Sequence, residues 1–355
     1  MTIVDVVLPE GVHDPDRPSG GNTYDHRVCA GLISLGWRVR EHLIAGTWPL
    51  PGAAGGTALA AAFTGIPDGS VVLVDGLVAA ADPGALVAAA GRLRLVVLVH
   101  MPVGEVPDGH ELIGTRDEER AVLTAAAAVV ATSRWSRDRL IREYGLAPHR
   151  VHVAEPGADA APVASGTQTG GQLLCVAAVA PHKGQDTLVA ALAEIADLPW
   201  RCTCVGPLDR NPRYVAGIRR AVDEHGLRNR VCFTGTRVGA DLDQAYAAAD
   251  ALVLASRGES YGMVVTEALA RGLPVVATAV GGVPESLGRT ADGRPPGLLV
   301  PRDDPYALAQ ALRRWLQDTN LRAELRQAAG ERRGTLASWA VPSARVAGVL
   351  GGLGH

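Results

Sequence analysis

Short runs of small and branched apolar residues recur along this chain of 355 residues, and they constrain its fold more than any other feature. Residues 71–74, 95–99 and 251–254 are examples, and each run is bounded by Gly, Pro or a polar residue. Unbroken apolar runs of this length are typical of strands buried on both faces, as in a parallel sheet. Ala-rich segments between the runs have the composition of helices, so the sequence predicts an α/β fold.

The alternation of strand and helix occurs in two halves. The length suits two domains of ordinary size, and residues 162–172, rich in Gly, Thr and Ser, are the predicted hinge between them. We therefore expect a Rossmann-like domain over residues 1–165, a second over residues 166–335, and a C-terminal helix over residues 336–355 that packs back toward the first domain.

Charge and cysteine content exclude several classes of function. The 34 Lys and Arg residues against 37 Asp and Glu give a net charge of −3, which provides no overall attraction for nucleic acid or an anionic membrane. The five cysteines lie mostly in apolar runs without zinc-site spacing, as expected for reduced thiols. The N-terminus lacks the basic start of a signal peptide, and no apolar run reaches the ~18–20 residues that span a bilayer. We expect a cytoplasmic protein without nucleic-acid or membrane partners; the sequence leaves its oligomeric state open.

Residues 254–274 carry the clearest functional pattern. They are predicted to form the end of a buried strand, a tight loop and a helix that closes at Gly272. The N–H groups of Gly262, Met263 and Val264 would then be unsatisfied donors at a helix N-terminus, where the helix dipole favours a phosphate. Because Gly262 has no Cβ, an anion can approach closely.

Two carboxylates flank this helix start. Glu259 lies in the loop and Glu267 lies about one turn inside the helix. Carboxylates suit hydroxyl groups, since each accepts two or more O–H donors. An anion site beside two hydroxyl-binding acids fits a sugar attached to a nucleoside diphosphate.

A second pattern follows the strand predicted to begin near residue 173. It contains Lys183, which is the only lysine among the 34 basic residues. A single lysine in an arginine-rich chain indicates a position whose role an arginine side chain would not fulfil.

The segment Glu259-x7-Glu267, followed by Ala-Leu-Ala-Arg-Gly-Leu-Pro-Val-Val-Ala-Thr, resembles the signature of the retaining glycosyltransferases of family 4. The resemblance extends from Gly20 to about Val300. It implies the GT-B fold, in which two Rossmann-like domains face each other across an interdomain cleft. The first domain would serve the acceptor and the second would bind the nucleotide sugar. The implied activity is that of a retaining hexosyltransferase that uses a UDP- or GDP-sugar and an acceptor, which we expect to be a small molecule.

The resemblance also assigns residues. Lys183, Glu259 and His100 would be catalytic, with Glu259 on the sugar hydroxyls and Glu267 on the ribose. His100 is placed at the mouth of the site because it follows a strand, as does Asp75. The donor-binding residues would be Gly20, Gly21, Gly206, Thr236, Arg237, Ser260, Tyr261, Gly262, Met263, Val264 and Glu267.

No protein nucleophile is evident, and the acceptor is expected to attack the face from which the diphosphate leaves. No Asp-x-Asp follows a strand near the site, so we expect neither a metal nor a cofactor beyond the nucleotide-sugar substrate.

One position departs from the family pattern. The family motif Gly-Arg-x4-Lys-Gly supplies an arginine and a lysine to the diphosphate; Lys183 matches, but Ala178 replaces the arginine. His182 and Arg257 are the candidates to compensate. This departure leaves two alternatives open: a catalytically silent nucleotide-sugar-binding protein, and a non-hydrolysing nucleotide-sugar epimerase. A dinucleotide dehydrogenase is disfavoured because no Gly-x-Gly-x-x-Gly follows a strand.

Overall fold

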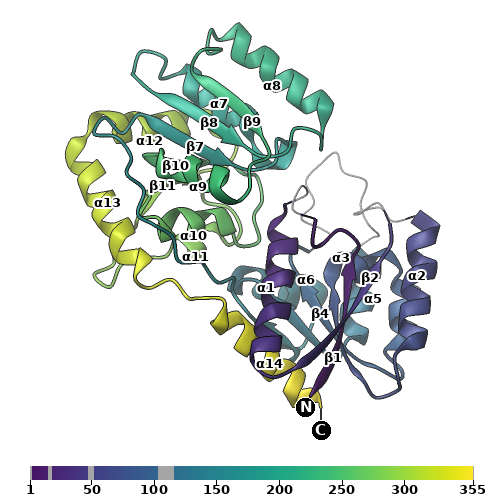
Figure 1. The fold of residues 1–355 in the computed structure, drawn as a ribbon. Coiled ribbons are helices and arrows are strands. Elements are labelled where there is room, and N and C mark those ends of the chain that lie inside the picture. The colour runs from purple at the N-terminus through teal and green to yellow at the C-terminus, as the bar shows by residue number, and fades with distance from the viewer. Residues whose placement is uncertain (1, 15–17, 47–51, 103–115, 355) are drawn as a thin grey trace. The chain divides into compact units, whose positions relative to one another are not determined.

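The chain forms two compact units, each built around its own parallel sheet (Figure 1). The computed structural model describes residues 2–14, 18–46, 52–102 and 116–354. We call the described residues up to Gly157, together with those from Ala337 onward, the N-terminal unit, and Ala158–Leu336 the C-terminal unit. The division therefore falls after residue 157, whereas the sequence placed it after residue 165.

The sheet of the N-terminal unit has six parallel strands in the order β2-β1-β3-β4-β5-β6. These strands are β1 (Ile3–Pro9), β2 (Arg38–Ile44), β3 (Val71–Asp75), β4 (Arg94–Val99), β5 (Ala128–Ala131) and β6 (Val151–Val153). β3 and β5 are buried along their whole length, which explains their unbroken apolar sequences. The strand order reverses between β1 and β3, so the topological switch point, where ligands bind in doubly wound folds, lies there.

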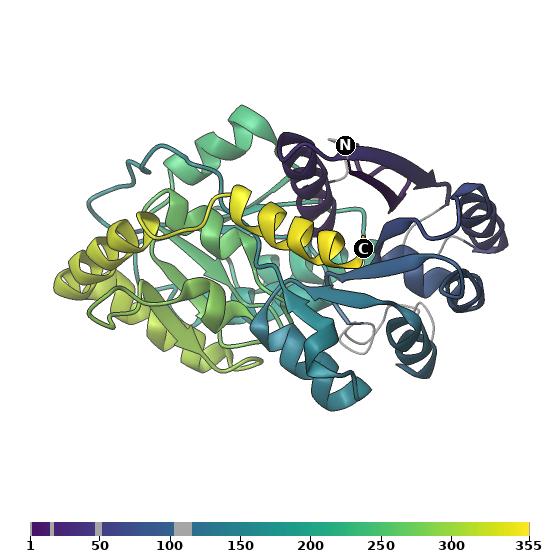
Figure 2. The same ribbon diagram turned by 90° about the horizontal axis from the view of Figure 1, so that it is seen from below.

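Seven α-helices and one 3₁₀ helix complete the described part of the N-terminal unit. They are α1 (Gly20–Ser34), α2 (Gly52–Gly65), α3 (Gly76–Ala81), α4 (Pro83–Ala89), α5 (Arg116–Ala125), α6 (Arg134–Tyr144), η2 (Pro148–Arg150) and α14 (Ala340–Leu353). The last of these lies beside α1 although the whole C-terminal unit separates them in sequence (Figures 1 and 2). A Cβ at Gly31 would lie 1.9 Å from Ser343 Oγ, so glycine permits the close approach. Val346 and Leu350 are fully buried in the same hydrophobic cluster as β1.

The sheet of the C-terminal unit also has six parallel strands, in the order β12-β11-β10-β7-β8-β9. They are β7 (Gln172–Val176), β8 (Arg201–Val205), β9 (Val231–Gly235), β10 (Ala251–Leu254), β11 (Val275–Thr278) and β12 (Gly297–Val300). Numbered within the unit, this is the dinucleotide-binding order 3-2-1-4-5-6, with its switch point between β7 and β10. The predicted class, two Rossmann-like α/β domains, is confirmed.

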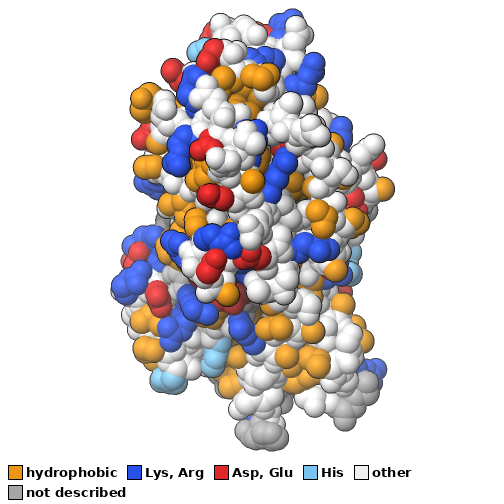
Figure 3. Space-filling model, turned by 90° about the vertical axis from the view of Figure 1, so that its left-hand side faces the viewer, with side chains coloured by type: hydrophobic (Ala, Val, Ile, Leu, Met, Phe, Trp, Pro, Cys, Tyr) orange, Lys and Arg blue, Asp and Glu red, His pale blue; other side chains and the backbone are white. Residues whose placement is uncertain are grey.

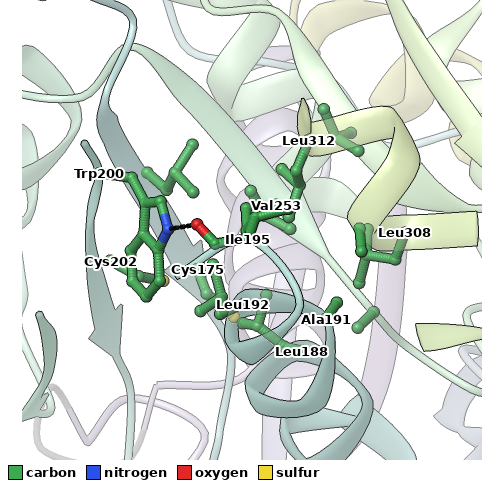
Figure 4. Close-up of a cluster of buried hydrophobic side chains, with 14 of the residues drawn as sticks. Cys175, Leu188, Ala191, Leu192, Ile195, Trp200, Cys202, Val253, Leu308 and Leu312 are labelled. Carbon is green, nitrogen blue, oxygen red and sulfur yellow. Dashed lines mark hydrogen bonds between the residues drawn. The ribbon is translucent and has the colours of Figure 1, made fainter. Parts of the chain in front are cut away.

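The helices of the C-terminal unit cover this sheet. They are η3 (Pro181–Lys183), α7 (Gln185–Ala193), α8 (Pro212–Glu224), α9 (Gly239–Ala247), α10 (Met263–Ala270), α11 (Val283–Leu287), α12 (Pro305–Gln317) and α13 (Thr319–Arg333). Figure 4 shows one part of the core, where Leu188 and Leu192 of α7 pack near Cys175 of β7. There the Trp200 Nε1–H donates to the carbonyl of Ile195 at 2.8 Å, so the buried indole is satisfied.

The predicted hinge, residues 162–172, belongs to the C-terminal unit and is bound to it. Asp250 is buried, and its carboxylate accepts hydrogen bonds from the Thr167 hydroxyl at 2.6 Å and the Gln172 N–H at 2.8 Å. Arg326 completes the carboxylate's partners with an ion pair at 2.9 Å. The segment's composition is typical of a linker, but a buried acid 83 residues away from Thr167 fixes its conformation.

The surface shows no strong segregation of charge on the face drawn in Figure 3, where basic and acidic side chains are interspersed with small hydrophobic areas. None of the described helices combines the length and the apolar character that crossing a bilayer would take.

Candidate active site

The switch point of the C-terminal unit brings the lone lysine and the first predicted acid together. We call residues 181–184, which follow β7, the lysine turn, and residues 255–262, which follow β10, the glutamate loop. Lys183 Nζ donates to Glu259 Oε1 at 2.6 Å, and the Ser256 hydroxyl donates to the same oxygen at 2.8 Å. The two charged side chains are 22% and 11% exposed. Glu259 Oε2 accepts no hydrogen bond from any residue that the structure describes, so it remains available to a ligand.

Backbone contacts set the positions of the lysine turn and the glutamate loop. Gly184 has φ +64°, and a Cβ there would lie 2.0 Å from the carbonyl oxygen of Ala255. Glycine is thus required both by its left-handed conformation and by the close approach of the two segments. On the other side, the Thr278 hydroxyl at the end of β11 donates to the Ser256 carbonyl at 2.5 Å.

Gly281 and Gly282 also fix the glutamate loop through backbone contacts. The Gly282 N–H donates to the carbonyl of Glu259 at 2.9 Å. A Cβ at Gly281 would lie 1.7 Å from that same carbonyl oxygen, and one at Gly282 would lie 2.2 Å from the Ser260 carbonyl oxygen. Any side chain at either position would therefore displace the loop that carries Glu259.

The start of α10 has the form that the sequence predicts for an anion site. Gly262 has φ +86° and is followed directly by the helix, and no side chain caps its first turn. The amides of Met263 and Val264 thus lie at an uncapped, electropositive helix end. The hydroxyl oxygen of Ser260 is shielded from solvent and has no hydrogen-bond partner among the described residues.

Glu267, inside α10, is held by a residue that the sequence did not reveal. The Tyr246 hydroxyl of α9 donates to Glu267 Oε2 at 2.7 Å. Burial raises the pKa of the Glu267 carboxyl. The hydrogen bond from Tyr246 and the charge of Arg271 lower this pKa and offset only part of the increase. The Arg271 guanidinium also lies over the Tyr246 ring, 4.3 Å from its centroid, and pairs with Asp243. The second predicted acid is therefore fixed by a layer of side chains behind it.

The loops after β8 and β9 adjoin the lysine side of this site. The Gly206 N–H donates to the carbonyl of Gly235 at 3.0 Å, and a Cβ at Gly206 would lie 2.1 Å from the carbonyl oxygen of Ala177. Thr236 and Arg237 follow Gly235, and Arg237 forms no ion pair or hydrogen bond with a described residue.

Arg257, one of the two candidates to compensate for Ala178, is not a free cation. At Ala178 the carbonyl accepts from Gln185 Nε2 at 2.8 Å, which ties the loop to the start of α7. Arg257 is engaged with Asp186 and Asp303. The expectation that Arg257 compensates for Ala178 is therefore not supported by its geometry.

In the N-terminal unit, the switch point carries a different cluster. His100, just after β4, has Nε2 at 2.9 Å from Asp25 Oδ1 and 3.3 Å from Asp75 Oδ2. Asp75 ends β3 and also caps α3, since its Oδ1 accepts from the Leu77 and Val78 amides at 2.8 and 3.1 Å. Both aspartates are buried. We call Asp25, Asp75 and His100 the carboxylate–imidazole cluster.

Mutual charges determine protonation in this cluster. Burial alone would lower the pKa of His100, but the two carboxylates raise it to about 10. Burial raises the pKa of Asp25 to about 6, Asp75 adds to this effect, and His100 opposes it. Within the described residues, these three are the set of His, Cys, Asp and Glu side chains whose ligand atoms lie close enough, within 4.8 Å, to hold a metal ion. In this cluster, the His100 imidazolium itself provides the positive charge beside the two aspartates.

Gly20 and Gly21 are the first residues of α1, next to this cluster. Ser19 caps the helix, because its Oγ accepts from the Asn22 N–H at 3.0 Å. A Cβ at Gly21 would lie 3.3 Å from His100 Cδ2, so the start of α1 packs directly on the imidazole. The Gly- and Pro-rich sequence of residues 103–115 predicts an acceptor-side loop, and residues 9–22 are a second loop expected to shape acceptor choice. All of the first segment and part of the second lie outside the described residues.

Solved structures share the fold of this chain. The sucrose-phosphate synthase of Thermosynechococcus elongatus is 24% identical, with a TM-score of 0.79 and coverage of 98% of both chains. HepE of Anabaena, solved in complex with UDP-glucose, is 19% identical, with a TM-score of 0.75 and coverage of 98% of this chain and 99% of that one. The fold is that of the GT-B glycosyltransferases.

Sequence comparison defines the family. The model described as "Glycosyl transferases group 1" matches residues 164–332, and that described as "Glycosyltransferase Family 4" matches residues 71–161. A D-inositol 3-phosphate glycosyltransferase of Salinispora tropica is 33% identical over 271 residues, which cover 66% of this chain and 55% of the relative. The chain belongs to glycosyltransferase family 4. The residues aligned with this chain cover little more than half the length of these curated relatives.

Proposed function

We propose that this protein is a retaining hexosyltransferase that moves a sugar from a nucleoside diphosphate to a small polar acceptor. The observation that carries the proposal is the Lys183–Glu259 pair, which lies at the switch point of the C-terminal unit, where doubly wound sheets bind nucleotides. Lys183 and Glu259 follow the two strands, β7 and β10, that flank this point.

The chemistry follows from the groups at this point. When the glycosidic bond to the diphosphate breaks, negative charge develops on the leaving phosphate. Lys183 and the uncapped amides of Met263 and Val264 are fixed donors for that charge, and fixed donors lower a barrier without reorganising. In the free protein, Lys183 is paired with Glu259. Donor binding would move the ammonium group onto the phosphate, and Glu259 Oε1 would then be free to accept hydrogen bonds from the sugar hydroxyls.

The remaining groups orient the donor and the acceptor. Glu267, held by Tyr246, is proposed to accept the ribose hydroxyls, and the loops at Gly206 and Thr236 to contact the base of a UDP- or GDP-sugar. His100 is proposed to contact the transferred sugar. Because no protein nucleophile is proposed, the acceptor hydroxyl attacks the face from which the diphosphate leaves and gives its proton to a phosphate oxygen. No cofactor is required by this scheme.

The names of the relatives support a small acceptor. The Salinispora relative is named for D-inositol 3-phosphate, and the structural neighbour from Thermosynechococcus is a sucrose-phosphate synthase. A phosphorylated polyol or sugar is therefore the acceptor class to test first.

The test is an assay of the purified protein with a panel of UDP- and GDP-sugars, with and without inositol phosphates and hexose phosphates. Release of free UDP or GDP is followed by mass spectrometry, and the anomeric configuration of the product by NMR. We expect release to depend on both donor and acceptor and the configuration to be retained. Glu259→Gln should abolish turnover, whereas Glu224→Gln, on the exposed surface of α8, is the matched control and should not change it.

Other outcomes would identify the alternatives. Conversion of the nucleotide sugar to an isomer without any acceptor would indicate an epimerase. Donor binding without turnover across the panel would indicate a silent binding protein, the alternative that Ala178 keeps open.

A further inference from the structure

Arg257 lies in the glutamate loop, two residues before Glu259, and its guanidinium is surrounded by hydrogen-bond acceptors. Nε donates to Asp303 Oδ1 at 2.6 Å. Nη1 and Nη2 donate to the two carboxylate oxygens of Asp186 at 3.0 and 2.8 Å, a bidentate pair. The two remaining N–H groups reach the carbonyl of Pro181 and the hydroxyl of Thr187. Since a guanidinium has five N–H donors, all of them are used within the protein.

These contacts hold the lysine turn at its backbone. In addition to the side-chain bond to the Pro181 carbonyl, the backbone N–H of Arg257 donates to the carbonyl of His182 at 2.8 Å. Arg257 therefore binds the two carbonyls that immediately precede Lys183. With Gly184 packed against Ala255, the turn is fixed on both sides of the lysine.

Two carboxylates bind the single positive charge of Arg257. Burial would raise the pKa of Asp186, but hydrogen bonds from Arg257 and Tyr214 lower it, so the pair stays ionised. Asp303 has φ +56°, the one left-handed backbone among the described residues other than glycine. Such a conformation costs free energy and persists only where surrounding contacts hold it, and the hydrogen bond from Arg257 is one such contact.

We propose that Arg257 is a positioning residue for donor binding: it locks the lysine turn to the glutamate loop and leaves Lys183 as the cation that meets the diphosphate. This inference rests on the proposed function for the identity of the ligand. The competing possibility is that Arg257 leaves its acids and binds phosphate itself, in place of the arginine missing at position 178.

Asp186→Asn separates the two possibilities because they predict opposite signs. If Arg257 positions the turn, then Arg257→Ala and Asp186→Asn both weaken binding of UDP or GDP, by about tenfold in calorimetric titrations. If Arg257 binds phosphate, Asp186→Asn frees the guanidinium, and affinity is kept or improved while Arg257→Ala loses it; that result would overturn the proposal. Arg228→Ala is the matched control, since Arg228 forms an exposed bidentate pair with Asp223 in the same unit and should leave affinity unchanged.

Chemical rescue tests positioning against a general loss of structure. Guanidinium chloride at low millimolar concentration should restore part of the UDP or GDP affinity of Arg257→Ala and none of that of Lys183→Ala. Absence of rescue in an Arg257→Ala variant that has the wild-type unfolding temperature would count against the proposal.

A readout without nucleotide distinguishes failure of this inference from failure of the proposed function. Because Lys183 is the chain's only lysine, an amine acylating reagent modifies one side chain, and peptide mass spectrometry separates it from the terminal amine. Both Arg257→Ala and Asp186→Asn should raise the acylation rate of Lys183 severalfold over wild type and over Arg228→Ala. An unchanged rate overturns the positioning role, whatever ligand the site binds; a raised rate in a protein that binds neither UDP nor GDP leaves positioning intact and refutes the proposed function.

Discussion

In the C-terminal unit, main-chain contacts at Gly184, Gly281 and Gly282, together with Arg257, place Lys183 and Glu259, whereas in the N-terminal unit His100 is placed by the side chains of Asp25 and Asp75. Lys183, Glu259, Asp75 and His100 lie at or after the carboxyl ends of strands in their sheets, whereas Asp25 comes from α1. The difference shows that equivalent positions in two similar folds can be built in two ways. A site fixed by backbone tolerates no added volume, while a site fixed by charged side chains depends on pH.

The largest expected effect tests the lysine. Lys183→Ala removes the cation proposed to meet the leaving phosphate, and losing one such preorganised donor lowers kcat by about 10²–10³-fold. Lys183→Arg keeps the charge but not the compact ammonium, so its loss should be smaller. Steady-state release of UDP or GDP measures both, and equal thermal unfolding curves are the control. Near-wild-type turnover of Lys183→Ala would remove this residue from the mechanism.

The next prediction tests backbone placement directly. Gly281→Ala puts a Cβ 1.7 Å from the Glu259 carbonyl oxygen in a left-handed turn, so we expect about 1–3 kcal/mol of destabilisation and a loss of activity as the glutamate loop shifts. Gly21→Ala is the counterpart in the N-terminal unit. Its Cβ meets only the His100 ring, at 3.3 Å, and alanine favours the helix, so the net change should be below about 1 kcal/mol. Denaturant unfolding compares the two variants.

Gly217→Ala in α8 is the control for the glycine series, because nothing lies within 4 Å of the added Cβ. This substitution should be neutral or slightly stabilising. If Gly281→Ala behaved like Gly217→Ala, the glutamate loop would not be fixed by its backbone neighbours.

A third prediction uses pH to test the carboxylate–imidazole cluster. The pKa of His100 is raised from 6.5 to about 10 in the folded protein, so its contribution to stability is complete below about pH 6.5 and is lost as pH rises to 10. Asp25, with a pKa of about 6, is already ionised above pH 7. The free energy of unfolding should therefore fall between pH 7 and 10 in wild type. His100→Gln should show a flatter profile there; parallel profiles would mean that the cluster does not hold a charged imidazole.

The smallest expected effect concerns Glu267. Tyr246→Phe removes one hydrogen bond to a carboxylate while keeping the ring under Arg271, a loss of about 1 kcal/mol. We expect a severalfold rise in the KM of the donor with little change in kcat, measured by the same steady-state assay. A change confined to kcat would argue against a role of Glu267 in donor binding.

How far the sequence predicts the site depends on where each residue lies relative to a strand. His100 directly follows an apolar run, and Lys183 and Glu259 lie in the loops after two others, so their placement at the edge of a parallel sheet can be predicted from order alone. Asp25 and Tyr246 could not be identified in this way. Asp25 lies inside a helix, and Tyr246 is a buried aromatic in an Ala-rich helix, which is more often a packing residue.

Long-range contacts are the part of the structure that local sequence patterns do not show. Local composition indicated a hinge over residues 162–172, but it carries no information about Asp250, which binds that segment from beyond β9. The local sequence also makes Arg257 a candidate for the missing phosphate ligand, but its guanidinium is bound by Asp186 and Asp303. In each case, a partner distant in sequence satisfies a group that appears free in the local pattern.

The docking of α14 on α1 has a consequence for biosynthesis. Val346 and Leu350 complete a hydrophobic cluster whose other members include Val4, Leu8 and Val28, so the domain begun first is discontinuous in the chain. Its core is not filled until α14 has emerged from the ribosome, by which time Ala158–Leu336 has been available to fold independently. A nascent chain stalled before Ala340 would present the apolar flank of α1 to chaperones, and a frameshift shortly before α14 would thus damage the N-terminal unit.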